Sequence, residues 1–136
     1  MSNGTYAIKI SRCTNVGTVD GGTNIGGIIG KLGISENDNI DTIEYCINAG
    51  FVNGIHSVGG ILGLDAGYND FIRSCLNVGV VIGLHPAATT GAILGEMANK
   101  DRIFIMNCIY DRQMFYDYEK QQNPQSKPSK YTGVGG

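Results

Sequence analysis

The sequence predicts an all-β protein, a short right-handed parallel β-solenoid (β-helix) of about three full coils and a partial fourth. Three observations predict it: a repeat of about 30 residues, alternation of residue types at every second position, and 21 glycines among 136 residues. The glycine share is roughly twice the usual one. Helical repeats are excluded because glycines recur every few residues and interrupt any continuous apolar stripe.

The repeat is marked by four cysteines that stand 33, 29 and 33 residues apart. The first three open the frame Cys-x-Asn-x-Gly-x-Val-x-Gly, and a glycine-rich block follows at residues 26–30, 59–63 and 91–95. A fourth copy keeps Ile105 and Cys108 but loses the glycine frame. A degenerate last copy is typical of the end of a repeat array.

Each copy is long enough for one coil with three short strands, stacked about 4.8 Å from its neighbours. Glycines at fixed offsets are expected to supply corners with positive φ. The repeat region is assigned to residues 1–111, with an aromatic cap and a polar extended arm at 112–136. The copies span residues 8–32, 41–64, 70–97 and, in part, 103–111.

Stacking turns every repeat position into a ladder of side chains. Asn15, Asn48 and Asn77 are expected to form a buried amide ladder, which would satisfy their polar groups. The cysteines could be ladder residues, disulfides or metal ligands. Zinc is disfavoured because no short Cys-x-x-Cys spacing occurs. In-register neighbours seldom present disulfide geometry, so buried reduced thiols are favoured. The structural cysteine ladder consists of Cys13, Cys46, Cys75 and Cys108.

The frame and the Gly-Gly-Ile-Ile/Leu-Gly blocks resemble the GLUG motif, a short repeat of large bacterial surface proteins, adhesins and IgA-peptidase-like proteins. The resemblance covers roughly residues 8–111. It implies a stalk or binding scaffold without assigned catalysis.

If the frame residues point inward, the residues between them point outward. In the first copy these outer residues are mostly polar, whereas in the second and third they are largely apolar. A large exposed apolar patch marks an interaction surface, so these positions form a candidate interface. The alternative is reversed parity near the third copy. The candidate interface residues are Ile47, Phe51, Leu76, Val78, Val80 and Ile82.

Other constellations are weaker. His56 and His85 should stack on adjacent coils, but two ligands alone make a poor metal site. Asp41 and Asp70, each five residues before a cysteine, form the best carboxylate couple for a glycosidase-like reaction. The loop at 35–39 is rich in oxygen ligands but lacks a calcium-binding pattern. No cofactor or metal is therefore expected.

Composition excludes further classes. The net charge is −2, so no basic field for nucleic acid exists. No apolar run approaches a membrane span, and the polar start does not predict a secretory signal. An insertion at residues 84–90 is expected to bulge from one corner of the third coil.

The function expected from these features is that of a non-catalytic structural or adhesive module of a larger bacterial cell-surface or secreted protein. It would bind protein, or a glycan, through one solenoid face. The alternative is an oligomeric phage virion part from a fibre or tail. A carbohydrate-active β-helix enzyme is the least favoured hypothesis.

Overall fold

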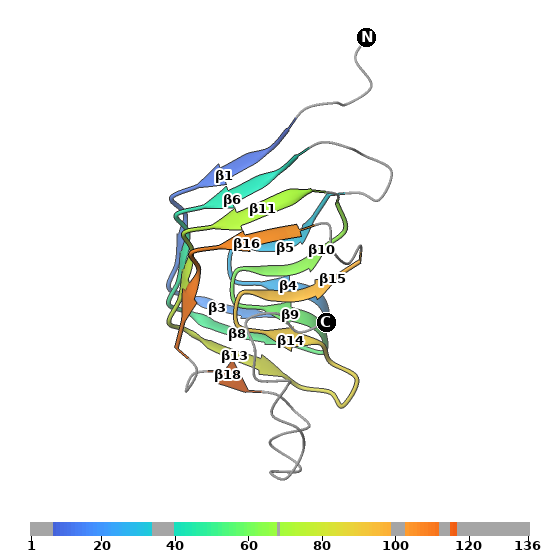
Figure 1. Ribbon diagram of the computed structural model, residues 1–136. Helices are drawn as coiled ribbons and strands as arrows, with labels where there is room; N and C mark the ends of the chain where they lie inside the picture. The colour runs from blue at the N-terminus through green and yellow to red at the C-terminus, as the bar shows by residue number, and fades with distance from the viewer. Residues whose placement is uncertain (1–6, 34–39, 68, 99–102, 112–114, 117–136) are drawn as a thin grey trace.

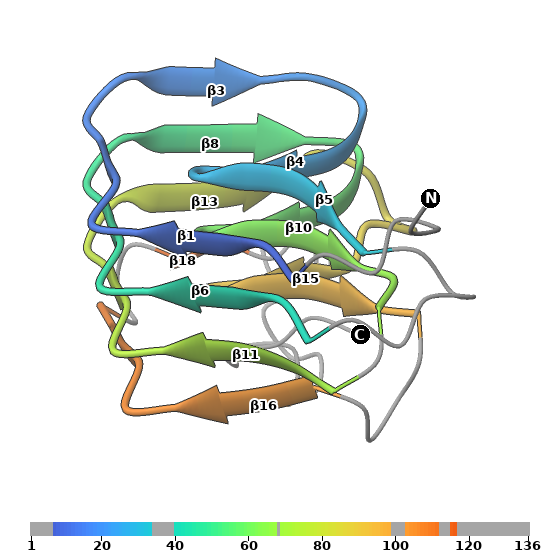
Figure 2. The ribbon, with the colours of Figure 1, turned by 90° about the horizontal axis from the view of Figure 1, so that it is seen from above.

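The computed structural model describes residues 7–33, 40–67, 69–98, 103–111 and the backbone of 115–116. All described secondary structure is β, and every strand pairing is parallel. Coils lie one above another, with β1, β6, β11 and β16 forming one visible stack (Figures 1 and 2). The predicted β-solenoid is confirmed.

The strands succeed one another coil by coil. The first coil contains β1 (Lys9–Ser11), β2 (Thr14–Asn15), β3 (Thr18–Asp20), β4 (Thr23–Gly26) and β5 (Ile29–Leu32). The second contains β6 (Thr42–Glu44), β7 (Ile47–Asn48), β8 (Phe51–Gly54), β9 (His56–Gly59) and β10 (Leu62–Asp65). The third contains β11 (Asp70–Arg73), β12 (Leu76–Asn77), β13 (Val80–Gly83), β14 (Thr90–Gly91) and β15 (Leu94–Met97). The fourth contains β16 (Ile103–Met106), β17 (Ile109–Tyr110) and β18 (Phe115–Tyr116).

Equivalent strands pair in register and build five walls. Each of the first three coils therefore contains five strands, not the three that the repeat length predicted. The walls are β1-β6-β11-β16, β2-β7-β12-β17, β3-β8-β13-β18, β4-β9-β14 and β5-β10-β15. The strand number was underestimated because each coil turns after only two to four extended residues. The segment assigned to an aromatic cap contributes β18, which pairs with β13. The polar arm at 117–136 lies outside the described residues.

The corners differ from expectation as well. The residue before each frame cysteine has a left-handed backbone, and it is never glycine: Arg12, Tyr45, Ser74 and Asn107 have φ of 59°, 53°, 54° and 54°. Such a backbone costs roughly 1–2 kcal/mol per residue, which the paired strands on either side must offset. Arg12 and Tyr45 also contact each other, with the guanidinium carbon 5.2 Å from the ring centroid.

Most glycines serve close packing between coils instead. Among the described glycines only Gly33 has a positive φ. A Cβ on Gly27 would lie 2.2 Å from the Gly60 carbonyl oxygen, and one on Gly60 would lie 2.1 Å from the Ala92 carbonyl oxygen. The glycine-rich block is therefore required because no side chain fits between successive coils there.

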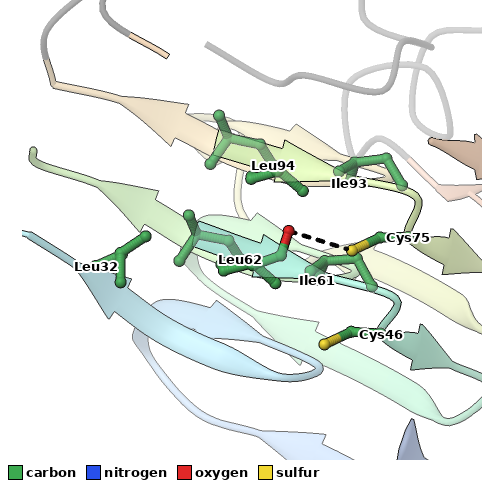
Figure 3. Packing of buried hydrophobic residues seen from close by; sticks show 9 residues of the cluster. Leu32, Cys46, Ile61, Leu62, Cys75, Ile93 and Leu94 are labelled. Atoms are coloured by element: carbon green, nitrogen blue, oxygen red, sulfur yellow. Dashed lines mark hydrogen bonds between the residues drawn. The ribbon is translucent and has the colours of Figure 1, made fainter. Parts of the chain in front are cut away.

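The core lies inside the walls as stacked aliphatic rungs. One rung joins Ile29, Leu62 and Leu94, which stand in register on three successive coils. Leu32, Ile61, Ile93 and the buried cysteines belong to the same cluster (Figure 3). A second cluster contains Val52, Val58, Val81 and Ala92. Ile43 and Ile72, which stand in register on the middle coils, are fully buried. Burial of each such side chain contributes about 1.5–3 kcal/mol.

Candidate functional site: the outer apolar face

The candidate interface forms an outer face on two adjacent walls, at β7 and β12 and at β8 and β13. Ile47 pairs with Leu76, and Phe51 pairs with Val80, so these side chains form two outward rungs. Ile47, Phe51 and Val78 remain 37%, 38% and 42% exposed. Leu76, Val80 and Ile82 are half-buried by their neighbours. We call these six residues the outer apolar face.

The parity of the frame agrees with the inward and outward assignment. Cys75, Asn77 and Val81 are buried on the third coil, while Val78 between them is exposed. The reversed-parity alternative is therefore wrong.

The outer apolar face ends at the first coil but continues to the fourth. At the first coil, Thr14 stands in register with Ile47, and Thr18 with Phe51, so the same rungs become polar and exposed there. At the fourth coil, Ile109 stands in register with Leu76 and is 67% exposed. Ile109 was not among the predicted interface residues, although its place directly after Cys108 matches that of Ile47 after Cys46. The apolar character extends to the last described coil.

A buried asparagine ladder fixes the wall behind this face. Asn15 Nδ2 donates to Asn48 Oδ1 at 2.9 Å, and Asn48 Nδ2 donates to Asn77 Oδ1 at 2.8 Å. Each Oδ1 also accepts from the backbone N–H two residues later, at 3.1–3.2 Å. The last amide turns to the carbonyl oxygen of Ala92, 2.9 Å away. The predicted amide ladder is confirmed. It fixes the spacing between the turns that precede β3, β8 and β13 on successive coils.

All four cysteines are free thiols. Cys46 and Cys75 are buried, Cys108 is half-buried and Cys13 is exposed. Burial raises the pKa of Cys46. The side-chain interaction between Cys75 and Cys108 raises the pKa of Cys75 and lowers that of Cys108 to about 7. The thiols behave as small apolar ladder residues whose reactivity should follow their exposure.

The two histidines lie together at one corner, as the sequence predicted. Their ring centroids are 5.4 Å apart and the ring planes are inclined by 58°. His85 lies in the insertion of the third coil, where its Nδ1 accepts from the Ala87 N–H at 3.0 Å. Both histidines are exposed, so the pair is a surface contact. The loop at 35–39, considered for calcium, lies outside the described residues.

The carboxylates Asp41 and Asp70 are brought together, but both are buried and bound to backbone. Asp41 Oδ1 accepts from the Ile8 N–H at 2.8 Å, and Asp70 Oδ1 accepts from the Asp41 N–H at 2.8 Å. Each aspartate therefore reaches back to the start of the preceding coil. This arrangement holds coil starts together, and it does not present two carboxylates to a solvent-exposed sugar.

Sequence reasoning missed a third acid, Asp65, beside this pair. Asp65 is fully buried at the end of β10 and stands in register with the apolar residues Leu32 and Met97. Its pKa is raised to about 7, chiefly by burial and then by Asp70. An acid at an otherwise apolar ladder position was the signal available in the sequence.

On the outside of the first wall, Glu44 binds two cations. Its Oε1 lies 2.9 Å from Arg73 Nη2 and 3.4 Å from Lys9 Nζ. These three residues come from β6, β11 and β1, so the ion pairs join three coils. Arg73, then Lys9, lowers the pKa of Glu44. Because the side chains of Lys9 and Arg73 are exposed, these two ion pairs contribute only modestly to the free energy of unfolding.

Within the described residues, no cluster of three or more His, Cys, Asp or Glu side chains could hold a metal ion. None of their elements is a helix with the length and apolarity to cross a membrane. Comparisons with protein-family models, curated proteins and solved structures find no match. The resemblance to the GLUG motif therefore stays a prediction based on the frame residues.

Proposed function

We propose that this chain is a non-catalytic structural or adhesive solenoid module of a larger bacterial cell-surface or secreted protein. It works by protein association through the outer apolar face. The observation that carries the proposal is the face itself: adjacent rungs of large apolar side chains remain exposed on a rigid parallel wall. Contiguous apolar surface of this kind marks an interaction site on soluble proteins.

Two further features support this proposal. The best carboxylate couple, Asp41 and Asp70, is engaged by backbone N–H groups inside the stack. Catalysis by retaining or inverting glycosidases needs two carboxyl groups facing a substrate cleft. The asparagine ladder and the close glycine contacts make the wall stiff, which suits a scaffold that presents one surface.

The experiment compares the solution mass of the chain by light scattering with that of two double variants. Ile47→Lys/Phe51→Lys places charges on the outer apolar face. Thr14→Lys/Thr18→Lys is the matched control, because it places the same charges at the same rungs of the first coil. We expect an oligomer for the natural chain and the control, and a monomer for the face variant.

The outcomes separate the hypotheses. Any oligomer that only the face variant dissociates would support association through this face. A single closed oligomer of fixed stoichiometry, as opposed to a mixture of sizes, would in addition favour the second candidate, a virion fibre or tail part. That candidate draws on the continuation of the apolar rung to Ile109 at the last described coil. Monomers for all three proteins would overturn association through this face.

A further inference from the structure

Two buried carboxyl groups meet where the second coil passes into the third. Asp65 ends β10 and Asp70 begins β11, and both side chains have no exposed surface. One oxygen of each is bound to backbone: Asp65 Oδ1 accepts from Gly67 N–H at 3.3 Å, and Asp70 Oδ1 from Asp41 N–H. The other oxygen of each, Oδ2, is buried without a hydrogen-bond partner when both groups are ionised.

Two adjacent buried anions with unpartnered oxygens are strongly unfavourable. A buried charge without a compensating partner costs several kcal/mol, and like charges in contact prevent both groups from ionising. A single proton removes both penalties. One carboxyl group then donates its O–H to the Oδ2 of the other, and each buried oxygen gains a partner.

No cation neutralises the pair within the part of the chain that the structure describes. The residues in register with it are apolar: Leu32 and Met97 flank Asp65, and Ile103 flanks Asp70. The charged group that acts on the pair is another acid, Asp41, which disfavours ionisation further.

The charged residues of the surrounding strands are directed elsewhere. Lys31 and Glu96 stand one position from the flanking residues on β5 and β15, so alternation sends them to the other face of that wall. Glu96 accepts from the hydroxyls of Ser57 and Thr89. On β6 and β11, Glu44 and Arg73 bind each other at 2.9 Å.

The chain also makes room for close contact between the two acids. A Cβ on Gly67 would lie 2.1 Å from Asp70 Oδ2, so only glycine allows this carboxyl group to sit in the turn. The turn is joined to the first coil as well, because Ala66 N–H donates to the Leu32 carbonyl oxygen at 2.8 Å.

We propose that Asp65 and Asp70 share one proton between their Oδ2 atoms, and that this proton is a pH-dependent lock on the passage from the second coil to the third. Below neutral pH the proton is bound and the connection between the two coils is stabilised. As pH rises toward neutrality and beyond, the proton leaves, two charges face each other, and the connection is weakened.

The sign follows from linkage. The pKa of Asp65 in the folded chain is about 7, well above the roughly 3.9 of an unfolded aspartate. The folded state therefore binds more protons between these values. The contribution of the pair to the free energy of unfolding is full at and below about pH 3.9. It falls as pH rises through the interval and levels off above about pH 7.

The experiment measures the unfolding equilibrium constant by denaturant titration at a series of pH values from 5 to 9. One shared proton predicts an increase of up to tenfold per pH unit between pH 5 and 7 for the natural chain. Asp65→Asn supplies a permanent donor to Asp70 Oδ2 and keeps Oδ1 for Gly67, so its constant should not show this increase. Asp70→Asn, which keeps an acceptor for Asp41 N–H, should do the same.

The control is Asp20→Asn, an exposed acid of the first coil, which should follow the natural chain at every pH. Every variant differs from the natural chain at one acid only, so all other groups contribute equally to the curves compared. The natural chain also gives a direct readout that needs no variant. A protonated carboxyl group should be visible by infrared spectroscopy at pH 6 and absent at pH 9.

Three outcomes would overturn the proposal. The pH dependence could persist unchanged in both amide variants, or no protonated carboxyl group could be found at pH 6. Alternatively, calcium could stabilise the natural chain at pH 8 and fail to stabilise Asp65→Asn. In that last case the pair would be a cation site and not a proton lock.

Discussion

The side-chain amide of Asn48 donates to Asn77 Oδ1 at 2.8 Å, directly between the second and third coils. Both side chains are buried, and both belong to the turn that follows a frame cysteine. The bond runs along the stack, parallel to the backbone ladders, so a side chain continues the pattern of the sheet through a corner. The ladder has one direction, because Asn15 and Asn48 each donate from Nδ2 to the Oδ1 of the asparagine on the next coil.

Asn48→Ala should therefore be among the most destabilising polar substitutions. It removes the acceptor of Asn15 Nδ2 and leaves the buried Gly50 N–H without its partner. We expect a loss of about 2–4 kcal/mol in the free energy of unfolding, measured by denaturant titration. Asn15→Ala, at the half-exposed first rung, is the control and should cost clearly less. Equal losses would contradict a special role for the middle rung.

The contact between Gly60 and the coil above it leads to a second prediction. A Cβ at Gly60 would lie 2.1 Å from the Ala92 carbonyl oxygen and 2.4 Å from Asn77 Nδ2. Because the nearest atom is backbone, Gly60→Ala should lower the free energy of unfolding by at least about 2 kcal/mol. Gly22→Ala is the matched control, since a Cβ there meets nothing within 4 Å. Thermal unfolding of both variants tests the difference, and similar melting temperatures would refute the packing argument.

The periodic part of the structure could be predicted because every coil repeats the same constraint. Isoleucine, cysteine, asparagine and valine rungs follow from in-register stacking, since a residue at one repeat position lies above its equivalent. The contact between His56 and His85 followed from the same argument, because the two residues hold the same repeat position on adjacent coils. The outward assignment of Val78 also followed from the alternation of the frame.

The sequence could not reveal two kinds of feature: corners whose residue type varies from coil to coil, and interactions that only one coil makes. The left-handed corners at Arg12 and Tyr45 carry no glycine, so residue type gave no sign of them. Asp65 stands where the other coils have leucine and methionine, and its contact with Asp70 depends on how one connection folds back. A pattern shared by three copies cannot predict an interaction that only one copy makes.

Glu44 should make the chain less stable as pH falls into the acid range, which is opposite in sign to the effect of the aspartate pair. Arg73, then Lys9, lowers the pKa of Glu44 below its unfolded value of about 4.5. Its contribution is present above that value and is lost as pH falls through the lowered pKa. We expect Glu44→Gln to lower the melting temperature at pH 5 to 6 and to match the natural chain at the most acidic pH that keeps both folded. A constant difference at all pH values would contradict this.

The cysteine ladder predicts an order of chemical labelling. Cys13 is exposed on the first coil, and Cys108 is half-buried with a pKa lowered to about 7 by the thiol of Cys75. These two should react with iodoacetamide at pH 8 in the folded chain. Cys46 and Cys75 should react only after unfolding, because both are buried and both have raised pKa values. Mass spectrometry of the digested chain assigns the labelled sites.

Two controls make the labelling decisive. Cys13→Ser should remove one fast label and leave the rate at Cys108 unchanged, because the two thiols lie at opposite ends of the stack. Cys75→Ala should slow labelling at Cys108, since the hydrogen bond from Cys75 is the largest cause of its lowered pKa. If Cys108 reacted at the same rate in Cys75→Ala, the thiols of the last two coils would not be coupled. If Cys46 reacted as fast as Cys13, the buried rung between the first and third coils would be open to solvent.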